Sequence, residues 1–195
     1  MNAALEPDGG SWQTQVPSTT GSAAFTTAPL DEDVVVYGSA SADLWLASTA
    51  TDTDLQVTVT EVRPDGQEQY VQRGWLRMSQ RALDEERSSE LRPFHPLTET
   101  ALEPLTPGEP TLGRVEIQKF SYAFRKGSRI RIWIDTPSTT GEQGFTPLDE
   151  QATNTVLHDA EHPSKIVFGL LRNAPEPKPL PDCGQVLSQP CRPDP

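Results

Sequence analysis

Residues 129–135 have the sequence RIRIWID, in which apolar and polar side chains alternate. Three isoleucines share one face of this stretch, and two arginines and a tryptophan share the other: Ile130, Ile132 and Ile134 against Arg129, Arg131 and Trp133. A period of two is typical of a β-strand that buries one face. The stretch therefore predicts a half-buried strand, and it is the cleanest strand pattern in the chain.

Similar patterns on both sides of this stretch predict further strands. They cover residues 40–48 (after an apolar run at 34–38), 55–62, 68–78, 112–120 and 165–171. Residues 55–62 and 68–78 flank the turn sequence Arg63-Pro64-Asp65-Gly66 and so predict a hairpin.

Alternation also predicts which side chains share one face of a strand, and for residues 55–62 the face of Leu55, Val57 and Val59 is expected to be the core face. One such face comprises Leu44 and Leu46, a second comprises Leu55, Val57 and Val59, and a third comprises Tyr70, Gln72, Gly74, Leu76 and Met78. Residues 79–108 break the pattern with charged side chains and prolines, and have room for one short helix. Structureless loops of this length are usually functional or flexible.

The chain shows no long amphipathic helix and no internal repeat. Short alternating strands between turns predict an all-β fold, an antiparallel β-sandwich of the jelly-roll kind. We expect three regions: a flexible lead-in at 1–24, the sandwich at 25–171, and a Pro-rich tail at 172–195 that is extended or disordered.

Composition excludes several classes of function. The formal net charge of −12 over 195 residues disfavours binding to nucleic acid or to anionic membranes. No apolar run approaches the ~20 residues that span a bilayer, and the first twenty residues show no signal-peptide pattern. The compartment stays open.

The two cysteines, Cys183 and Cys191, both lie in the tail. Because zinc sites usually need four ligands and the tail has no histidine, a metal site there is not expected. Two alternatives remain: a small disulfide loop in an exported protein, or two free thiols.

No residue pattern indicates catalysis, a cofactor or a metal. The Gly-x-Ser-x-Gly pentapeptide of α/β-hydrolases is absent, and the three histidines (His95, His158 and His162) lie in predicted loops. The pair His158 and His162 is a weak metal signal without a helix or third ligand. Asp52 and Asp54 could serve a calcium site, but a role in fixing a turn is favoured.

Three tryptophans, Trp45, Trp75 and Trp133, fall on predicted strands. Aromatic rings on a sandwich face can stack on sugars, but more often they pack under a loop or against a neighbouring domain. Because Arg129 and Arg131 flank Trp133, the sequence favours an interface on this face.

Several motifs in order resemble one known family, the C-terminal domain of CocE/NonD hydrolases, also called the X-Pro dipeptidyl-peptidase C-terminal domain. In the first half they are FTTAPLDEDV (25–34), GSASADLWLAS (38–48), DTDL (52–55) and VRPDG (62–66). In the second half they are FHPL (94–97), YAFRKGSRIRI (122–132), Asn154-Thr155 and HDAEHPSKI (158–166). Each motif is weak alone, but their order and spacing agree over residues 25–171.

The resemblance implies a jelly roll similar to galactose-binding-like domains, packed on an α/β-hydrolase domain that carries the Ser, Asp and His triad. Family members hydrolyse X-Pro peptides, amino-acid esters or related acyl compounds. Because the triad lies in the other domain, no catalytic residue carries over to this chain. One departure is Ser128, where the family usually has a histidine that we interpret as structural.

The resemblance leads to an accessory role, in which the domain shapes substrate access and helps to assemble oligomers. Residues expected at the interdomain contact are Trp133, Arg129, Arg131, Phe94 and His95. The alternatives are a carbohydrate- or ligand-binding β-sandwich module and a free-standing structural protein. Fold analogy alone is a weak basis for choosing between them.

Overall fold

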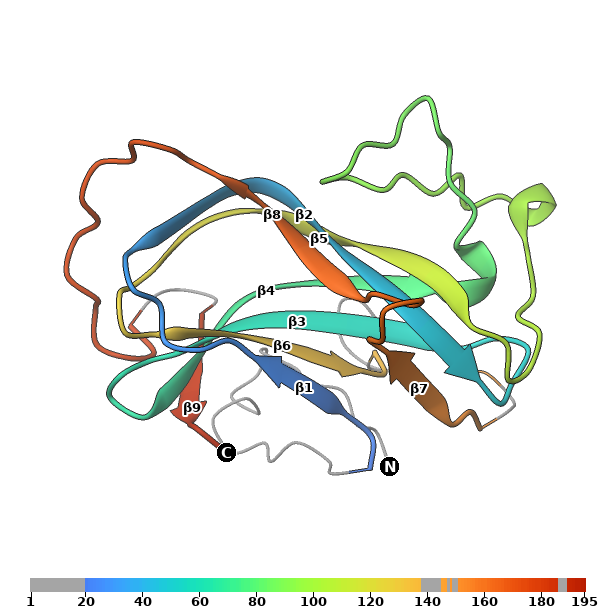
Figure 1. The fold of residues 1–195 in the computed structure, drawn as a ribbon, viewed down its shortest axis with the longest axis horizontal. Coiled ribbons are helices and arrows are strands. Elements are labelled where there is room, and N and C mark those ends of the chain that lie inside the picture. The colour runs from blue at the N-terminus through green and yellow to red at the C-terminus, as the bar shows by residue number, and fades with distance from the viewer. Residues whose placement is uncertain (1–19, 138–144, 147, 149–150, 186–188) are drawn as a thin grey trace.

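Two antiparallel β-sheets pack face to face in the computed structural model (Figure 1), which describes residues 20–137, 145–146, 148, 151–185 and 189–195. One sheet has five strands, in the order β1 (Ala23–Thr26), β6 (Arg129–Asp135), β3 (Asp54–Val62), β4 (Gln67–Arg77) and β9 (Cys191–Pro193). The other has the order β5 (Thr111–Phe124), β2 (Val34–Ser48) and β7 (Asn154–Leu157), and β8 (Lys165–Leu170) also pairs with β2.

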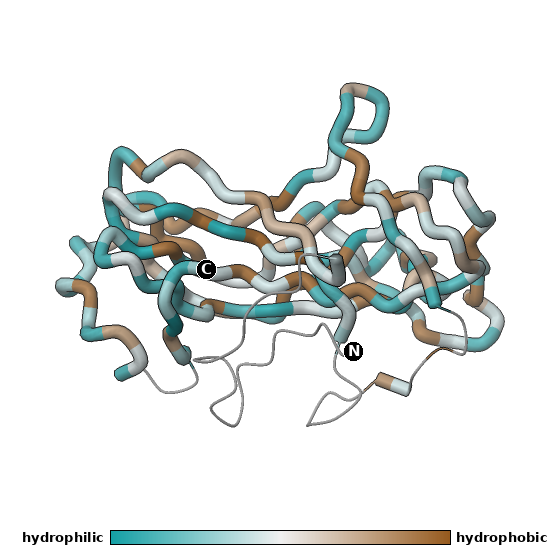
Figure 2. Tube along the Cα trace, turned by 90° about the horizontal axis from the view of Figure 1, so that it is seen from below, coloured by the Kyte–Doolittle hydropathy of each residue, from teal (hydrophilic) through white to brown (hydrophobic). Residues whose placement is uncertain are grey.

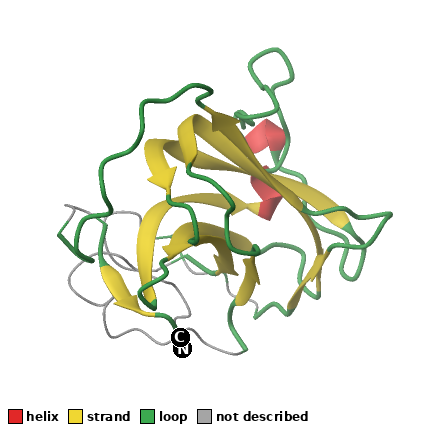
Figure 3. Ribbon diagram, turned by 60° about the vertical axis from the view of Figure 1, so that its left-hand side comes forward, coloured by secondary structure: helices red, strands yellow, loops and turns green. Residues whose placement is uncertain are grey.

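Helical structure is limited in the described residues to two 3₁₀ turns, η1 (Met78–Gln80) and η2 (Glu99–Ala101), drawn red in Figure 3. Both fall in the segment that joins β4 to β5, where the sequence left room for one short helix. Among these same residues, none of the helices is long or apolar enough to cross a bilayer.

The core lies between the two sheets, and the predicted alternation places it there. Ile130, Ile132 and Ile134 of β6 face the core, and the apolar residues of β2 and β3 meet them. Apolar and polar segments alternate along the strands in Figure 2, as expected when each sheet buries one face. The predicted antiparallel β-sandwich is confirmed, and the jelly-roll form stays an expectation.

The predicted strands all form, and three further strands were missed. β1 and β7 have four residues each, and β9 has three. Such segments are too short for a period of two to be visible in the sequence. β9 lies in the Pro-rich tail, so a part of that tail is a strand of the five-stranded sheet.

In β4 the prediction that Tyr70 shares a face with Gly74 and Leu76 is wrong. The register with β3 shifts between Val59, which faces Gln72, and Thr60, which faces Tyr70. The extra residue, Val71, joins the core, and Tyr70 packs with Trp133 on the outer face. A β-bulge inserts one residue into a strand and so reverses the alternation beyond it.

Candidate interdomain surfaces

The five residues expected at an interdomain contact lie on two opposite faces of the sandwich. Arg129, Arg131 and Trp133 are on the outer face of the five-stranded sheet, because the isoleucines between them face the core. Phe94 and His95 belong to the loop between β4 and β5, which projects beyond the sheet of β2, β5 and β8 (Figure 1). One flat contact cannot include both groups.

Trp133 is buried by its own chain. Its side chain is 8% exposed, and its indole Nε1 donates to Glu68 over 2.6 Å. The guanidinium carbons of Arg131 and Arg192 lie 5.6 and 5.5 Å from its ring centroid, within the range of cation–π contact. Arg192 comes from β9, so a side chain of the C-terminal strand covers the Trp133 ring on the face that the sequence indicated as an interface. Arg129 on the same face is exposed.

Glu68, at the centre of this arrangement, was not singled out from the sequence. Its fully buried carboxylate accepts hydrogen bonds from Thr60 Oγ1 at 2.7 Å and from Trp133 Nε1. Arg192 Nε and Nη2 approach its second oxygen to 2.8 and 2.6 Å, and Arg131 Nη1 lies at 3.4 Å. A buried charge needs such partners to offset its desolvation. A glutamate beside a tight turn gives no sequence signal of burial.

The tryptophans do not offer open stacking platforms. Trp75 Nε1 donates to Gln56 Oε1 over 2.7 Å, and the guanidinium of Arg73 lies 4.9 Å from the Trp75 ring centroid. On the other sheet, the ring of Trp45 meets the His162 ring edge-on at 5.1 Å. These contacts disfavour the sugar-stacking role considered for the tryptophans.

His95 fixes its loop to the sandwich. Its ring nitrogens lie 3.1 Å from the carbonyl oxygen of Ala82 and 2.9 Å from that of Arg114 on β5. Arg114 in turn donates to the carbonyls of Ser89 and Glu90 and pairs with Asp43 of β2 at 3.0 Å. The loop is therefore ordered on the outer face of this sheet.

Phe94 lies next to His95, at the base of the exposed end of the loop. Its amide donates to Ser88 Oγ over 2.9 Å, and the guanidinium of Arg87 stacks 3.5 Å from its ring centroid. Leu97, a few residues on, is 68% exposed and has a positive φ of 53°. At this loop Arg87 and Leu97 are exposed, and the Phe94 ring is half-buried with Arg87 stacked on it.

The aspartates considered for calcium have structural contacts. Asp52 accepts from the amides of Thr53 and Ser79 at 2.9 and 2.8 Å, which is the favoured turn role. Asp54 forms a two-pronged ion pair with Arg77, both contacts at 2.8 Å, and this hydrogen bonding raises the pKa of Arg77. Among the described residues, no group of three His, Cys, Asp or Glu side chains is placed to hold a metal ion.

The other two histidines contact an aromatic ring and a turn. His158 meets Phe25 edge-on at 5.7 Å. His162 approaches Asp159, which also accepts from the amides of Glu161 and His162 at 2.9 Å. These two amide bonds lower the pKa of Asp159. The contacts of Asp159 with Glu161 and His162 therefore stabilise a turn and do not form a catalytic pair.

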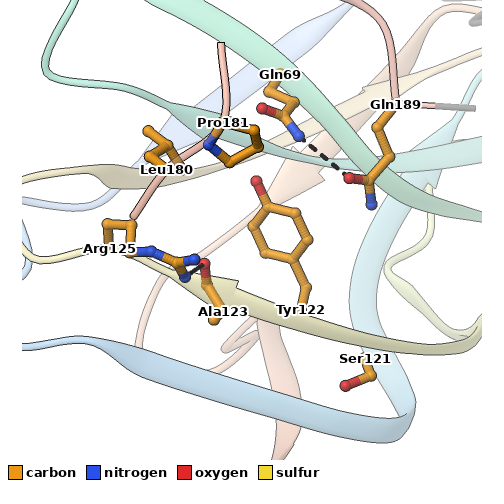
Figure 4. Close-up of a pocket in the computed structure, with 8 residues that line it drawn as sticks. All are labelled: Gln69, Ser121, Tyr122, Ala123, Arg125, Leu180, Pro181 and Gln189. Carbon is orange, nitrogen blue, oxygen red and sulfur yellow. Dashed lines mark hydrogen bonds between the residues drawn. The ribbon is translucent and has the colours of Figure 1, made fainter. Parts of the chain in front are cut away.

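A polar cavity of about 290 Å³ lies between the edges of the two sheets (Figure 4). Its lining residues come from β4, β5 and the tail: Gln69, Ser121, Tyr122, Ala123, Arg125, Leu180, Pro181 and Gln189. The Tyr122 hydroxyl donates to the buried Glu61 over 2.5 Å. Burial first, and then the Glu61 charge, raise the pKa of Tyr122.

Cys183 and Cys191 form a disulfide, with Cα atoms 5.5 Å apart. Of the two thiol states that the sequence left open, the structure has the disulfide. Ser128, at the position where the family usually has histidine, is fully buried, and its hydroxyl has no hydrogen-bond partner among the described residues.

A known protein family matches most of the chain. The family described as the X-Pro dipeptidyl-peptidase C-terminal non-catalytic domain matches residues 3–167. A candidate serine esterase of Mycobacterium bovis is 32% identical over 112 residues, covering 56% of this chain and 18% of that protein. Cocaine esterase of Rhodococcus sp. is 27% identical over 161 residues, covering 76% of this chain and 25% of that protein.

Solved structures agree in fold. A CocE/NonD family hydrolase from Staphylococcus aureus superposes with a TM-score of 0.68 at 20% identity, covering 77% of this chain and 30% of that chain. The chain spans between about a fifth and a third of the length of the proteins that it matches. The chain belongs to the X-Pro dipeptidyl-peptidase C-terminal non-catalytic domain family.

Proposed function

We propose that this chain is the accessory domain of a serine hydrolase, and that it packs on an α/β-hydrolase catalytic domain and shapes substrate access. The observation that carries the proposal is the match of residues 3–167 to a non-catalytic domain family. The contacts of the three histidines support a non-catalytic role, because they are with backbone carbonyls, a turn aspartate and aromatic rings.

The loop that carries Phe94 and His95 is the favoured contact surface. His95 and Arg114 fix it to the sandwich, and it carries the half-buried Phe94 ring with the exposed Arg87 stacked on it. Interfaces are enriched in aromatic and arginine side chains, which suits Phe94 and Arg87. The face of Trp133 is less suited, because β9 already covers that ring. Oligomer formation remains a second proposed role of the domain.

The first experiment tests the non-catalytic role. The purified chain, incubated with chromogenic ester and X-Pro substrates, should show no turnover. Turnover abolished by a serine-directed inhibitor would overturn the proposal. In the genome, a coding region with a Gly-x-Ser-x-Gly domain is expected in frame with Met1 or adjacent to it, and its absence would also count against an accessory role.

The second experiment tests the contact surface with that catalytic domain. Phe94→Ala should weaken the affinity between the two domains about 10-fold or more, as truncation of a central aromatic contact does. Arg129→Ala, an exposed change on the opposite face, is the matched control and should leave the affinity unchanged. The reverse result would move the interface to the face of β6.

A further inference from the structure

The segment after β8 forms a strap that joins the two sheets, and it lies beyond the residues that match the family. We define the C-terminal strap as residues 178–185 and 189–195. It passes around one end of the sandwich and ends as β9 on the edge of the five-stranded sheet (Figure 1). The family match ends at residue 167, so the strap lies outside the matched residues.

Polar contacts fix the first half of the strap. Arg125 Nη2 donates to the carbonyl oxygen of Lys178 over 2.7 Å. Arg63 Nη1 donates to the carbonyl of Pro181 over 2.9 Å. Both donors belong to the sandwich, next to the turns that precede β4 and β6.

The second half pairs with β4. Cys191 faces Gln69 in the β-ladder, and the amide of Tyr70 donates to the carbonyl of Pro190 over 3.0 Å. The side-chain amide of Gln69 also donates to Gln189 over 3.1 Å. These contacts place β9 beside the start of β4.

The strap also delivers the main positive charge to Glu68. Arg192 is 2% exposed and contacts Glu68 through two nitrogens, while Arg131 lies at 3.4 Å. Asp194 pairs with Arg131 at 2.6 Å, which ties the end of the strap to β6. When β9 leaves the sheet, Glu68 loses this partner and the Trp133 ring loses one of its two neighbouring cations, while Arg131 stays on β6.

The disulfide lies wholly within the strap. Cys191 begins β9, and Cys183 lies in the turn where the amide of Gln185 donates to the carbonyl of Asp182 over 3.2 Å. The bond therefore does not tie the strap to the sandwich. It closes the strap into a small loop, which reduces the conformational entropy lost when Gln189, Cys191 and Arg192 dock.

We propose that the Cys183–Cys191 disulfide is a redox latch for the C-terminal strap. In the oxidised chain the strap is docked, and reduction releases β9 and uncovers Glu68 and Trp133. A thiolate of a dithiol reductant attacks one sulfur of the disulfide, which forms a mixed disulfide and releases the other cysteine as a thiolate. The second thiol of the reductant, as its thiolate, then attacks the reductant's own sulfur in the mixed disulfide and releases the remaining cysteine, and both cysteine thiolates take up protons. Both cysteines end as thiols, and the reductant ends as a disulfide. The latch does not depend on the proposed accessory role.

Hydrogen–deuterium exchange of the 195-residue chain, with and without dithiothreitol, tests the latch. Among residues 67–70, which lie next to β9, the Tyr70 amide donates to Pro190 of the strap and should exchange about 10-fold faster or more after reduction, because local opening becomes easier. Amides of β2 in the other sheet should keep their rate. Unchanged exchange at the Tyr70 amide would overturn the latch, and an equal rise in β2 would also overturn it, because the disulfide would then stabilise the whole fold.

Two variants complete the test. The double variant Cys183→Ser, Cys191→Ser should show fast exchange at the Tyr70 amide without dithiothreitol and no response to it. Arg192→Gln in the oxidised chain should raise exchange at the same amide, because the charge on Glu68 loses its partner. If the double variant keeps slow exchange at the Tyr70 amide, the disulfide does not hold the strap and the proposal fails.

Discussion

Two fully buried glutamates show how single residues specify this sandwich. Glu61 faces β5, and it accepts from the Tyr122 hydroxyl and from the amide of Arg125. Glu68 lies on the outer face and is paired with Arg192 of the strap. Each carboxylate costs free energy to bury unless its partners are in place, so each favours one arrangement of distant segments.

The pairing at Glu68 can be tested by removing its main partner. Arg192→Ala leaves a buried carboxylate with a weaker contact to Arg131, and we expect a loss of about 3 kcal/mol in the free energy of unfolding. Urea denaturation followed by far-UV circular dichroism measures it. The exposed change Arg129→Ala should stay within about 0.5 kcal/mol of the original chain. Equal effects of the two changes would contradict the assigned role of Arg192.

Tyr122 predicts a dependence of stability on alkaline pH. Its pKa is raised above the ordinary value of 10.0 by burial and by Glu61, so the folded state keeps the proton that the unfolded state releases. The stabilisation is complete below about pH 10 and decreases as the pH rises above that value.

Tyr122→Phe should therefore be less stable at pH 7 by about 1–3 kcal/mol, because Glu61 loses a donor. It should also lose less stability than the original chain between about pH 9 and 11. Tyr37→Phe, at a tyrosine that is 65% exposed, should keep the original pH dependence. Denaturant midpoints measured at several pH values test this prediction. If the midpoint depends on pH identically in all three chains, the role of Tyr122 is refuted.

At the scale of strands, close approach of β4 to β5 depends on a glycine. A Cβ atom at Gly74 would lie 2.0 Å from the carbonyl oxygen of Glu116 on β5. Backbone cannot move aside as the end of a flexible side chain can, so the two strands would have to separate. The contact explains why the core face of β4 contains a residue with no side chain.

Gly74→Ala should cost about 2–4 kcal/mol of unfolding free energy, because the added methyl overpacks this contact. Gly66→Ala is the matched control, since Gly66 has a φ of 78° and open space around it. Its cost should be about 1–2 kcal/mol, from the left-handed backbone alone. Thermal unfolding compares the two. A smaller loss at Gly74 than at Gly66 would contradict the packing argument.

The strands that could be predicted were those long enough to show alternation. Residues 129–135 are one example, because the isoleucines and their polar neighbours differ at every step. The bulge at Val71 could not be predicted, because both Tyr70 and Val71 are acceptable on a core face. β9 could not be predicted either, because its stability comes from Glu68 and from β4 rather than from its own three residues.

At the scale of the molecule, the two sheets of the sandwich contact different segments. The five-stranded sheet takes the C-terminal strap at its β4 edge, with Arg192 reaching Glu68 on the outer face, and the face of the other sheet carries the ordered loop with Phe94 and His95. The sequence placed Trp133 and Phe94 in one predicted interface. It could not separate them, because pairing of Trp133 with Arg192 joins segments that are far apart along the chain.

The position of β9 also bears on how this protein behaves in concentrated solution. A sheet edge with unpaired amides and carbonyls is a template on which a second molecule can add its own strand. β9 covers residues 67–69 of β4, and the edge that it presents instead is three residues long and includes Pro193, with Pro190 just before it. Proline has no amide hydrogen to donate, so this edge is a poor template. Storage or expression under reducing conditions should therefore favour aggregation through the exposed end of β4.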